Sequence, residues 1–209
     1  MTERELILSA APRSRRDSEG GGASRTRGEW QVRAFDAERD GDAVSRIDTS
    51  YTSDQVYAVH RSGDVVALAP SSAAAPHGRR TALDLAARPW AHGCVAVLDE
   101  RVRGFVGWEL ETGSRRMTIC QFHVDRPYRR RGAGRRLMDA ALDWARRAGA
   151  VTARLEISSA NHTAITVVRR LGLEICGFDT TLYRGTSNQG EVAVYMAVTL
   201  DGDGRPQPG

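Results

Sequence analysis

The segment VDRPYRRRGAGRRLM, Val124–Met138, decides the fold of this chain. Its first residues end a strand, Gly132 and Gly134 turn the chain, and a helix begins directly afterwards. Small residues at such a turn let backbone amides converge, and with the helix N-terminus these amides form a seat for phosphate oxygens. Five arginines surround the seat with positive charge: Arg129, Arg130, Arg131, Arg135 and Arg136. The segment therefore predicts a strand–turn–helix unit that binds a diphosphate.

The residues after this turn alternate between helix and strand patterns. From Gly134 to Ala148, apolar side chains fall on one broad face and charged side chains on the other, which is typical of an amphipathic helix. A strand at 151–157, a helix at 161–171 and a strand at 173–178 follow. Such a series predicts parallel pairing, because strands that run in the same direction are joined by crossover helices.

The residues before the turn have the pattern of an antiparallel meander. A strand at 30–35 and a helix at 36–47 open it. Five short strands then follow, at 56–60, 65–68, 94–98, 104–110 and 117–124. The segment 69–90, rich in Ala, Ser, Pro and Arg, predicts a long loop. The expected fold class is therefore α+β, a mixed central sheet with an antiparallel meander and then a parallel strand pair, flanked by helices.

Length and composition indicate one domain with tails. The chain has 209 residues, of which 41% are apolar and 27% charged, values typical of a globular protein. We expect one domain over 29–200 and disordered tails at 1–28 and 201–209, where glycine, proline and charged residues gather. No run of about 18 apolar residues is present, which excludes a membrane-spanning helix.

Cysteine, histidine and lysine usage exclude several kinds of site. Three distant cysteines, Cys94, Cys120 and Cys176, predict neither a disulfide framework nor a cysteine zinc site, and they fit a reducing cytoplasm. The five histidines form no HxxxH pair, so no metal site is expected. All thirty basic residues are arginine, so the chain has no lysine for covalent catalysis.

Other anion-binding motifs compete with the diphosphate interpretation. A dinucleotide turn requires GxGxxG and a phosphate loop requires GxxxxGK[ST], and neither motif is present. An arginine cluster attracts any polyanion, so a nucleic-acid patch is an alternative. Since no recognition-helix or aromatic-sheet pattern accompanies the cluster, we expect no nucleic-acid partner.

The run RRRGAG, Arg129–Gly134, resembles the R/Q-x-x-G-x-G/A turn that holds the diphosphate of acetyl-CoA in the GNAT superfamily of N-acetyltransferases. Residues 155–183 are also similar to the strand, asparagine-led helix and strand of that fold. Within the superfamily, 47–59 and 175–196 resemble the streptothricin acetyltransferases. The resemblance spans about 30–198 and is weakest across 69–90.

The resemblance implies how the cosubstrate acetyl-CoA is held. The backbone of Phe122 and Val124 would pair with the pantetheine amides as an added strand, and Asn161 would hold the far side of the cofactor arm. Asn161 also suits a helix N-cap, and the two roles are compatible. The remaining expected cofactor-binding residues form the turn: Arg129, Arg130, Arg131, Gly132, Ala133, Gly134 and Arg135.

The resemblance is incomplete at the catalytic positions. Related enzymes place an acid on the strand before the turn and a tyrosine in the second helix, but this strand carries no acid and Val168 stands at the tyrosine position. His123 is the substitute base that we expect, although a structural histidine is an equal alternative. Tyr183 is the expected acid, with Tyr195 and Cys120 as fallbacks.

A cationic acceptor requires carboxylates. The residues expected to bind it are Asp48, Tyr51, Asp54, Glu109 and Asp179, with Glu111 as a further carboxylate. Asp48 and Asp54 could instead cap helices. Arg79, Arg80 and Arg88 in the segment 69–90 argue against a polycationic acceptor.

The expected function is transfer of acetyl from acetyl-CoA to a primary amine of a small molecule in a direct ternary complex, and the best-matched acceptor is a streptothricin-like antibiotic. Two alternatives stay open: another small amine such as a polyamine or aminoglycoside, and an acyl-CoA-binding module without turnover. We expect a cytoplasmic monomer or homodimer with no membrane partner.

Overall fold

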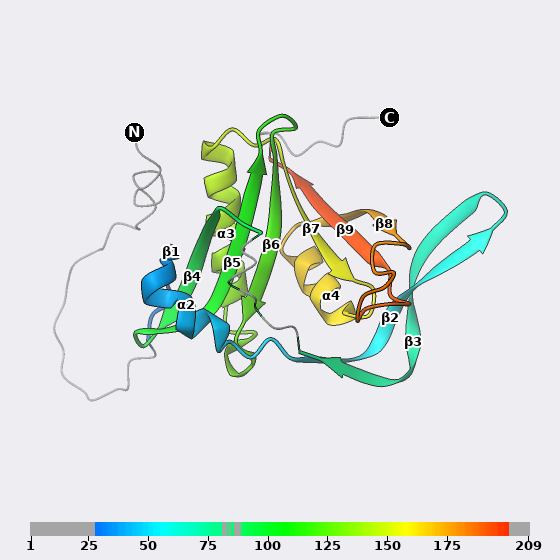
Figure 1. Ribbon diagram of the computed structural model, residues 1–209, viewed down its shortest axis with the longest axis horizontal. Coiled ribbons are helices and arrows are strands. Elements are labelled where there is room, and N and C mark those ends of the chain that lie inside the picture. Colours follow the sequence, from blue (N-terminus) through cyan, green and yellow to red (C-terminus); the bar gives the residue numbers. More distant parts are fainter. Residues whose placement is uncertain (1–27, 81–82, 84, 86–88, 201–209) are drawn as a thin grey trace.

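A seven-stranded mixed sheet forms the centre of the molecule. The computed structural model describes residues 28–200 except 81, 82, 84 and 86–88. The sheet has the order β1-β4-β5-β6-β7-β9-β8, and β2 and β3 form a separate two-stranded sheet (Figure 1). The elements are β1 (Gln31–Ala34), α2 (Ala37–Ser45), β2 (Tyr51–Ser62), β3 (Val65–Arg79), β4 (His92–Leu98), β5 (Arg101–Glu111), β6 (Arg116–Val124), η1 (Arg126–Tyr128), α3 (Ala133–Arg147), β7 (Thr152–Ser158), α4 (His162–Arg170), β8 (Glu174–Asp179) and β9 (Ala193–Thr199).

The opening strand and helix form as expected. The carboxylate of Asp36 accepts hydrogen bonds from the amides of Glu38 and Arg39 and so caps α2. Asp40 of α2 is buried. Its carboxylate accepts hydrogen bonds from both terminal nitrogens of Arg33 on β1, at 2.6 and 2.8 Å. These bonds hold the pKa of Asp40 at about 2 against the effect of its burial.

The meander and the parallel pair are both present. β4, β5 and β6 pair antiparallel, and β1 joins β4 at the edge. β6 and β7 are parallel, as expected for strands joined by α3. β9, which the sequence interpretation did not separate as a strand, pairs antiparallel with β7 and with β8. β8 therefore lies one strand further from β6 than a simple alternating series predicts.

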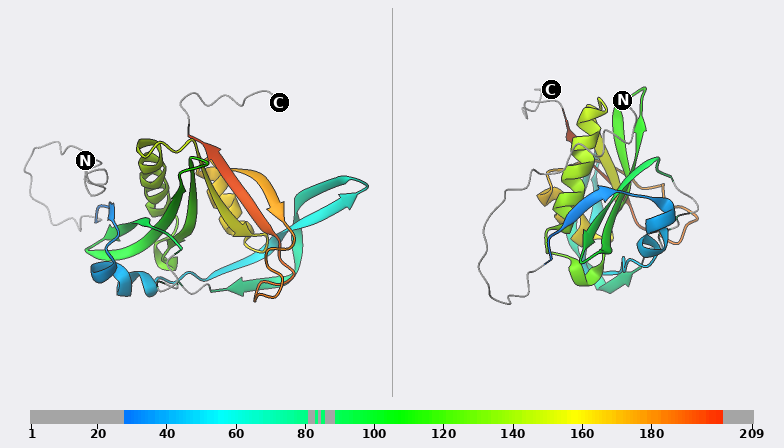
Figure 2. Two further views of the ribbon diagram at one scale, coloured as in Figure 1. Left: turned by 45° about the horizontal axis from the view of Figure 1, so that its top comes forward. Right: turned by 90° about the vertical axis from the view of Figure 1, so that its left-hand side faces the viewer.

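The β2–β3 hairpin corrects two expectations. Its strands run far beyond 56–60 and 65–68, and they pair with each other in a separate sheet rather than extending the meander. The loop predicted over 69–90 is wrong for 69–79, which continue β3 against β2 as far as the pair Tyr51↔Arg79. Alanine and serine are weak strand formers, so the sequence concealed a strand that its partner stabilises. The turn end of the hairpin projects away from the main sheet in Figure 1 and in the left-hand view of Figure 2.

Helices cover both faces of the main sheet (Figure 2). Leu137, Met138 and Ala141 of α3 share one core with Ile165 and Val168 of α4. On the other face, the end of α2 packs in a second core with residues of β4 and β5: Val44, Val95, Val97 and Phe105. Val168 is therefore a core residue.

Some expectations are not tested by this fold. The predicted tails, except Gly28, lie outside the described residues, as do 81, 82, 84 and 86–88 of the segment 69–90. Within the described residues, no helix is long and apolar enough to cross a membrane.

Candidate active site

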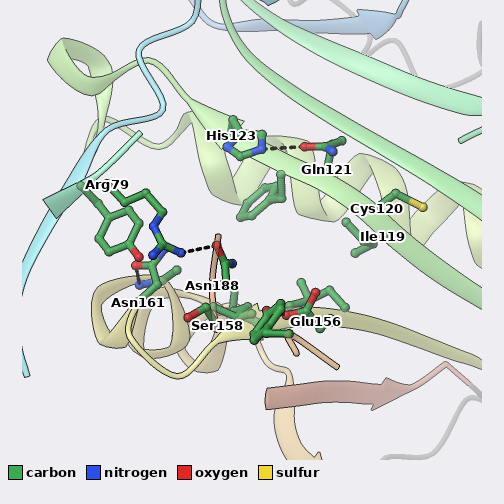
Figure 3. A pocket seen from close by; sticks show the side chains of 16 residues that line it. Arg79, Ile119, Cys120, Gln121, His123, Glu156, Ser158, Asn161 and Asn188 are labelled. Atoms are coloured by element: carbon green, nitrogen blue, oxygen red, sulfur yellow. Dashed lines mark hydrogen bonds between the residues drawn. The ribbon is translucent and has the colours of Figure 1, made fainter. Parts of the chain in front are cut away.

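β6 and β7 separate after a short ladder and leave a cavity between them. The ladder joins Arg116–Ile119 to Thr152–Leu155, and the later residues of these two strands, all described, do not pair with each other. On its other side β6 carries a bulge at Cys120, which the register with β5 skips. A bulge bends its strand, so β6 turns away from β7 at this point. A cavity of about 270 Å³ lies between the two strand ends (Figure 3).

The turn between β6 and α3 presents backbone amides. Gly132 is the N-cap of α3, has φ of +89° and offers no side chain to the first amides of the helix. Those amides have no acceptor within the helix, as at every helix N-terminus. A Cβ at Gly132 would meet nothing within 4 Å, so the space before the helix is open. The turn therefore fits the diphosphate of acetyl-CoA, with Gly132–Arg135 supplying the amides.

The Arg129 side chain holds this turn against the segment before β2. Its guanidinium donates to the carbonyl oxygens of Val124, Ser50 and Asp48, at 2.9, 2.6 and 3.0 Å. The amide of Asp48 donates to Asp125 at 3.2 Å, so the segment before β2 is fastened to the turn twice. The Arg129 side chain, expected at the diphosphate, is thus engaged with three carbonyls.

The other turn arginines have different surroundings. Arg131 lies over the ring of Tyr128, with its guanidinium carbon 5.5 Å from the ring centre. Arg135 donates to the carbonyl of Arg170 at 3.0 Å. Arg130 is exposed and has a φ of +60°. The arginine side chains that are engaged elsewhere leave the main-chain amides of the turn as the expected donors to an anion.

Asn161 and Phe122 both line the cavity. Asn161 is the N-cap of α4 and accepts a hydrogen bond from the amide of Ala164 at 3.1 Å, which confirms the capping role. Val124 packs toward α3. Its Cγ2 would lie 3.8 Å from a Cβ placed on Gly134. Its carbonyl is the acceptor for Arg129.

His123 lines the cavity beside Gln121 (Figure 3). Nε2 of His123 and Oε1 of Gln121 lie 2.8 Å apart. Burial lowers the pKa of His123 to about 4, and the positive charge of Arg129 adds to this effect. The imidazole is neutral at pH 7 and is a weak base there.

Tyr183 meets a carboxylate that the sequence interpretation missed. Its hydroxyl donates a hydrogen bond to Glu156 of β7, and both residues line the cavity. Burial raises the pKa of Tyr183, and the hydrogen bond to Glu156 and its charge raise it further. Desolvation likewise raises the pKa of Glu156, while the hydrogen bond from Tyr183 opposes this rise. Glu156 occupies an ordinary strand position, so no motif in the sequence marks it.

A second group of missed residues joins the hairpin to the cavity wall. Arg79 at the end of β3 forms an ion pair with Glu191 at 2.6 Å and donates to Asn188. The hydroxyl of Ser158 on β7 donates to the same Glu191. The charge of Arg79, which the sequence set against a cationic acceptor, is thus paired with a carboxylate.

Most expected acceptor ligands lie away from the cavity. Of Asp48, Tyr51, Asp54, Glu109 and Asp179, Tyr51 alone lines it. Both Asp48 and Asp179 accept hydrogen bonds from backbone amides within their own turns. The amide of Ser50 donates to Asp48 at 3.0 Å, and the amide of Thr181 donates to Asp179 at 2.6 Å. These bonds lower the pKa of both carboxyl groups.

The remaining candidate carboxylates are exposed on strands. Asp54 lies at a register irregularity in β2, so it does not cap a helix. Glu109 lies on β5 opposite Thr118, and Glu111 accepts hydrogen bonds from Ser114 and Thr118.

Comparison with known proteins agrees with this geometry. The acetyltransferase (GNAT) family model matches residues 63–173. Streptothricin acetyltransferase of Streptomyces lavendulae is 34% identical over 169 residues, which cover 76% of this chain and 89% of the relative.

Solved structures extend the likeness to most of the chain. The crystal structure of nourseothricin acetyltransferase matches with a TM-score of 0.75 and 33% identity, covering 82% of this chain and 98% of that one. A protein from Bacillus anthracis, solved in complex with acetyl coenzyme A, has a TM-score of 0.70 at 22% identity, covering 83% and 99% of the two chains. The chain therefore belongs to the GNAT family and is an acetyl-CoA-dependent acetyltransferase.

Proposed function

We propose that this enzyme transfers the acetyl group of acetyl-CoA to a primary amine of a streptothricin-like antibiotic, and so confers resistance in the cytoplasm. The observation that carries the proposal is the match to streptothricin and nourseothricin acetyltransferases at 34% and 33% identity over most of the chain. The three free cysteines fit a reducing compartment.

Acetyl-CoA, when bound, supplies an acetyl group on a thioester. The amides of Gly132–Arg135 bind its diphosphate at the start of α3. The edge of β6 at Phe122 and Val124, which β7 does not pair, bonds to the amides of the cofactor arm, and Asn161 lies on the far side. These contacts orient the thioester between β6 and β7, where Cys120 bends the strand.

Direct transfer to the amine is favoured over an acyl-enzyme. The chain has no lysine, and Cys120 is the cysteine that lines the cavity. Its thiol donates to the carbonyl of Pro89 at 3.1 Å. Burial raises the pKa of this thiol, and the nearby charge of Glu109 raises it further. Cys120 therefore stays protonated at neutral pH and is a poor nucleophile.

Tyr183 is the group that protonates the departing thiolate. Its raised pKa keeps the hydroxyl protonated at neutral pH, so a proton is available. We expect Tyr183→Phe to lower kcat by ~10²-fold while the KM for acetyl-CoA changes little. Steady-state kinetics of thiol release measures both constants. An unchanged kcat would assign the proton to another donor.

The acceptor enters on the side of the hairpin. Glu156 gives this side of the cavity a negative charge. Arg79 also lines the cavity, but its positive charge is neutralised by the ion pair with Glu191. An ammonium group is attracted to such a wall. A polyamine or aminoglycoside would be attracted in the same way, but the relatives favour the antibiotic.

The test is thiol release with a panel of amines. We expect streptothricin to be turned over with a higher kcat/KM than spermidine or kanamycin, and resistance when the gene is expressed in a sensitive host. If the enzyme acetylates another amine but not streptothricin, the proposed identity of the acceptor is wrong.

A further inference from the structure

A carboxylate lines the cavity. Among the described lining residues, Glu156 is the only aspartate or glutamate, and it projects from β7 opposite Cys120, Gln121 and His123 of β6 (Figure 3). The thioester is expected between these strands. Glu156 is thus placed where the attacking amine must lie, and no carboxylate of the expected acceptor set shares that place.

We propose that Glu156 is the general base that takes the proton from the acceptor amine, and that Tyr183 passes a proton to the departing sulfur in the same relay. The proposal rests on the acetyl transfer proposed above. A carboxylate has two oxygens with several acceptor sites, so the bond from Tyr183 leaves Glu156 free to accept an amine proton.

The step balances within the pair. The amine nitrogen forms a bond to the acetyl carbon, the carbon–sulfur bond breaks, and one N–H proton moves to Glu156. Tyr183 donates its O–H proton to the sulfur, and the proton on Glu156 then moves to the phenolate oxygen along the hydrogen bond between them. The pair ends as it began, and the net change is one proton from nitrogen to sulfur.

The hydrogen bond also sets the order of these events. While Glu156 is charged, it raises the pKa of Tyr183 and keeps the phenol protonated. Once Glu156 has taken the amine proton, that negative charge is gone and Tyr183 becomes a better acid. Tyr183 is therefore ready to donate only after the amine has been deprotonated, which keeps the two proton transfers in step with acetyl transfer.

His123 is the competing base. It lines the same cavity, but its pKa near 4 is further below neutral pH than suits a base, and Gln121 holds Nε2. The pKa of Glu156 is shifted upward from its ordinary value, toward neutral pH. We therefore assign His123 to the wall of the acceptor pocket, where it orients Gln121.

Several charged and titratable groups lie near Glu156. Tyr183 lies after β8, Tyr195 is its cross-strand partner on β9, and Glu191 lies in the β8–β9 connection. Arg154 on β7 lies over Tyr195, Arg79 on β3 pairs with Glu191, and His123 faces from β6. Of these groups, the charge of Glu191 raises the pKa of Glu156 and the Tyr183 bond lowers it.

The decisive variant is Glu156→Gln, which keeps the size of the side chain and removes the base. We expect kcat to fall by ~10²-fold with little change in the KM for acetyl-CoA, as for other general bases. Glu174→Gln, an exposed change at the start of β8, is the matched control and should leave kcat unchanged. Glu156→Asp should retain part of the activity. A kcat of Glu156→Gln within about threefold of the wild-type kcat would overturn the proposal.

Two readouts separate a base from a structural role. Formate added to Glu156→Ala should restore part of kcat, since a small carboxylate fits the vacated space. The acidic limb of the kcat/KM profile belongs to Glu156, so Glu191→Gln should shift it to lower pH and Tyr183→Phe should shift the residual activity to higher pH. Absence of rescue together with an unmoved acidic limb would contradict the assignment.

Failure of the acceptor proposal is distinguishable from failure of this one. The kinetics use whichever amine the wild-type enzyme acetylates, so loss of streptothricin as acceptor leaves the Glu156 comparison intact. If wild type turns over no amine in the panel, both proposals are rejected. If wild type acetylates streptothricin and Glu156→Gln does so equally well, only the base assignment falls.

Discussion

The two sides of the active-site cavity are built differently. The proposed cofactor side comes from one continuous segment, from Phe122 on β6 to Arg135 in α3, and the binding groups we expect there are backbone amides. The acceptor side is assembled from β3, β7 and the loop between β8 and β9. Its binding groups are side chains, and its ion pair joins Arg79 to Glu191, 112 positions apart.

This difference separates a shared function from a specific one. Backbone amides at a helix start bind any ligand with the same diphosphate, so the cofactor side needs only glycine and a correct turn. Side chains on the acceptor side can change without disturbing that turn. Arg129 connects the cofactor side to the segment that leads into the β2–β3 hairpin, because its guanidinium bonds both the strand end at Val124 and the carbonyls of Asp48 and Ser50. Perturbing each part in turn should therefore give a different kinetic signature.

The largest effect is expected at the connection. Arg129→Leu leaves the carbonyls of Asp48, Ser50 and Val124 without their donor, and unsatisfied polar groups at such sites cost ~1–3 kcal/mol. We expect the free energy of unfolding to fall by about 2 kcal/mol and the KM values of both substrates to rise.

Urea denaturation and steady-state kinetics measure these changes. Arg136→Leu, at an exposed position in α3, should change stability by less than ~0.5 kcal/mol. Equal stability of the two variants would show that the bonds of Arg129 do not hold the segment before β2.

An intermediate effect is expected on the cofactor side. Gly132→Ala places a Cβ on a residue with φ of +89°, in the left-handed region, at a strain of ~1 kcal/mol. We expect lower stability and up to about fivefold weaker binding of acetyl-CoA, with kcat retained. Calorimetry measures the affinity. Gly113→Ala, also in open space but without positive φ, should change neither, and no difference between the two variants would count against a backbone-built seat.

The smallest kinetic effect is expected at His123, whose side chain lines the cavity from β6. At pH 8, His123→Gln should keep kcat within about threefold of wild type, because the imidazole is not the base. The same residue should contribute to acid sensitivity. Its folded pKa of about 4 lies below the value of 6.5 for a free histidine, so the unfolded chain binds more protons between these values.

Wild type should therefore lose stability as pH falls from 6.5 toward 4, and His123→Gln should lose less over that range. Thermal unfolding at several pH values measures the slope, with His60→Gln on the exposed part of β2 as control. A large drop in kcat for His123→Gln with full activity for Glu156→Gln would exchange the roles of the two residues.

Local sequence patterns predicted the elements of the main sheet except β9. The helix after the turn, the asparagine that begins α4 and the antiparallel strands all depend on contacts within a few residues or on a hydrophobic period. The pairing partners were harder. β3 continues to Arg79 through alanine and serine because β2 supplies its hydrogen-bond partners, and β9 lies between β7 and β8 because their edges were open to it.

The chain by itself determined the cofactor side, since Gly132 and the amides that follow it act through the geometry of one turn. Only the tertiary structure decided the acceptor side. Nothing near Glu156 in sequence distinguishes it from another strand residue, and it acquires a partner and a raised pKa only when Tyr183 and Glu191 fold against it. The physical reason is range: a helix start is fixed by neighbouring residues, whereas the charge and hydrogen bonding of a side chain in a cavity are set by groups that the fold brings from elsewhere.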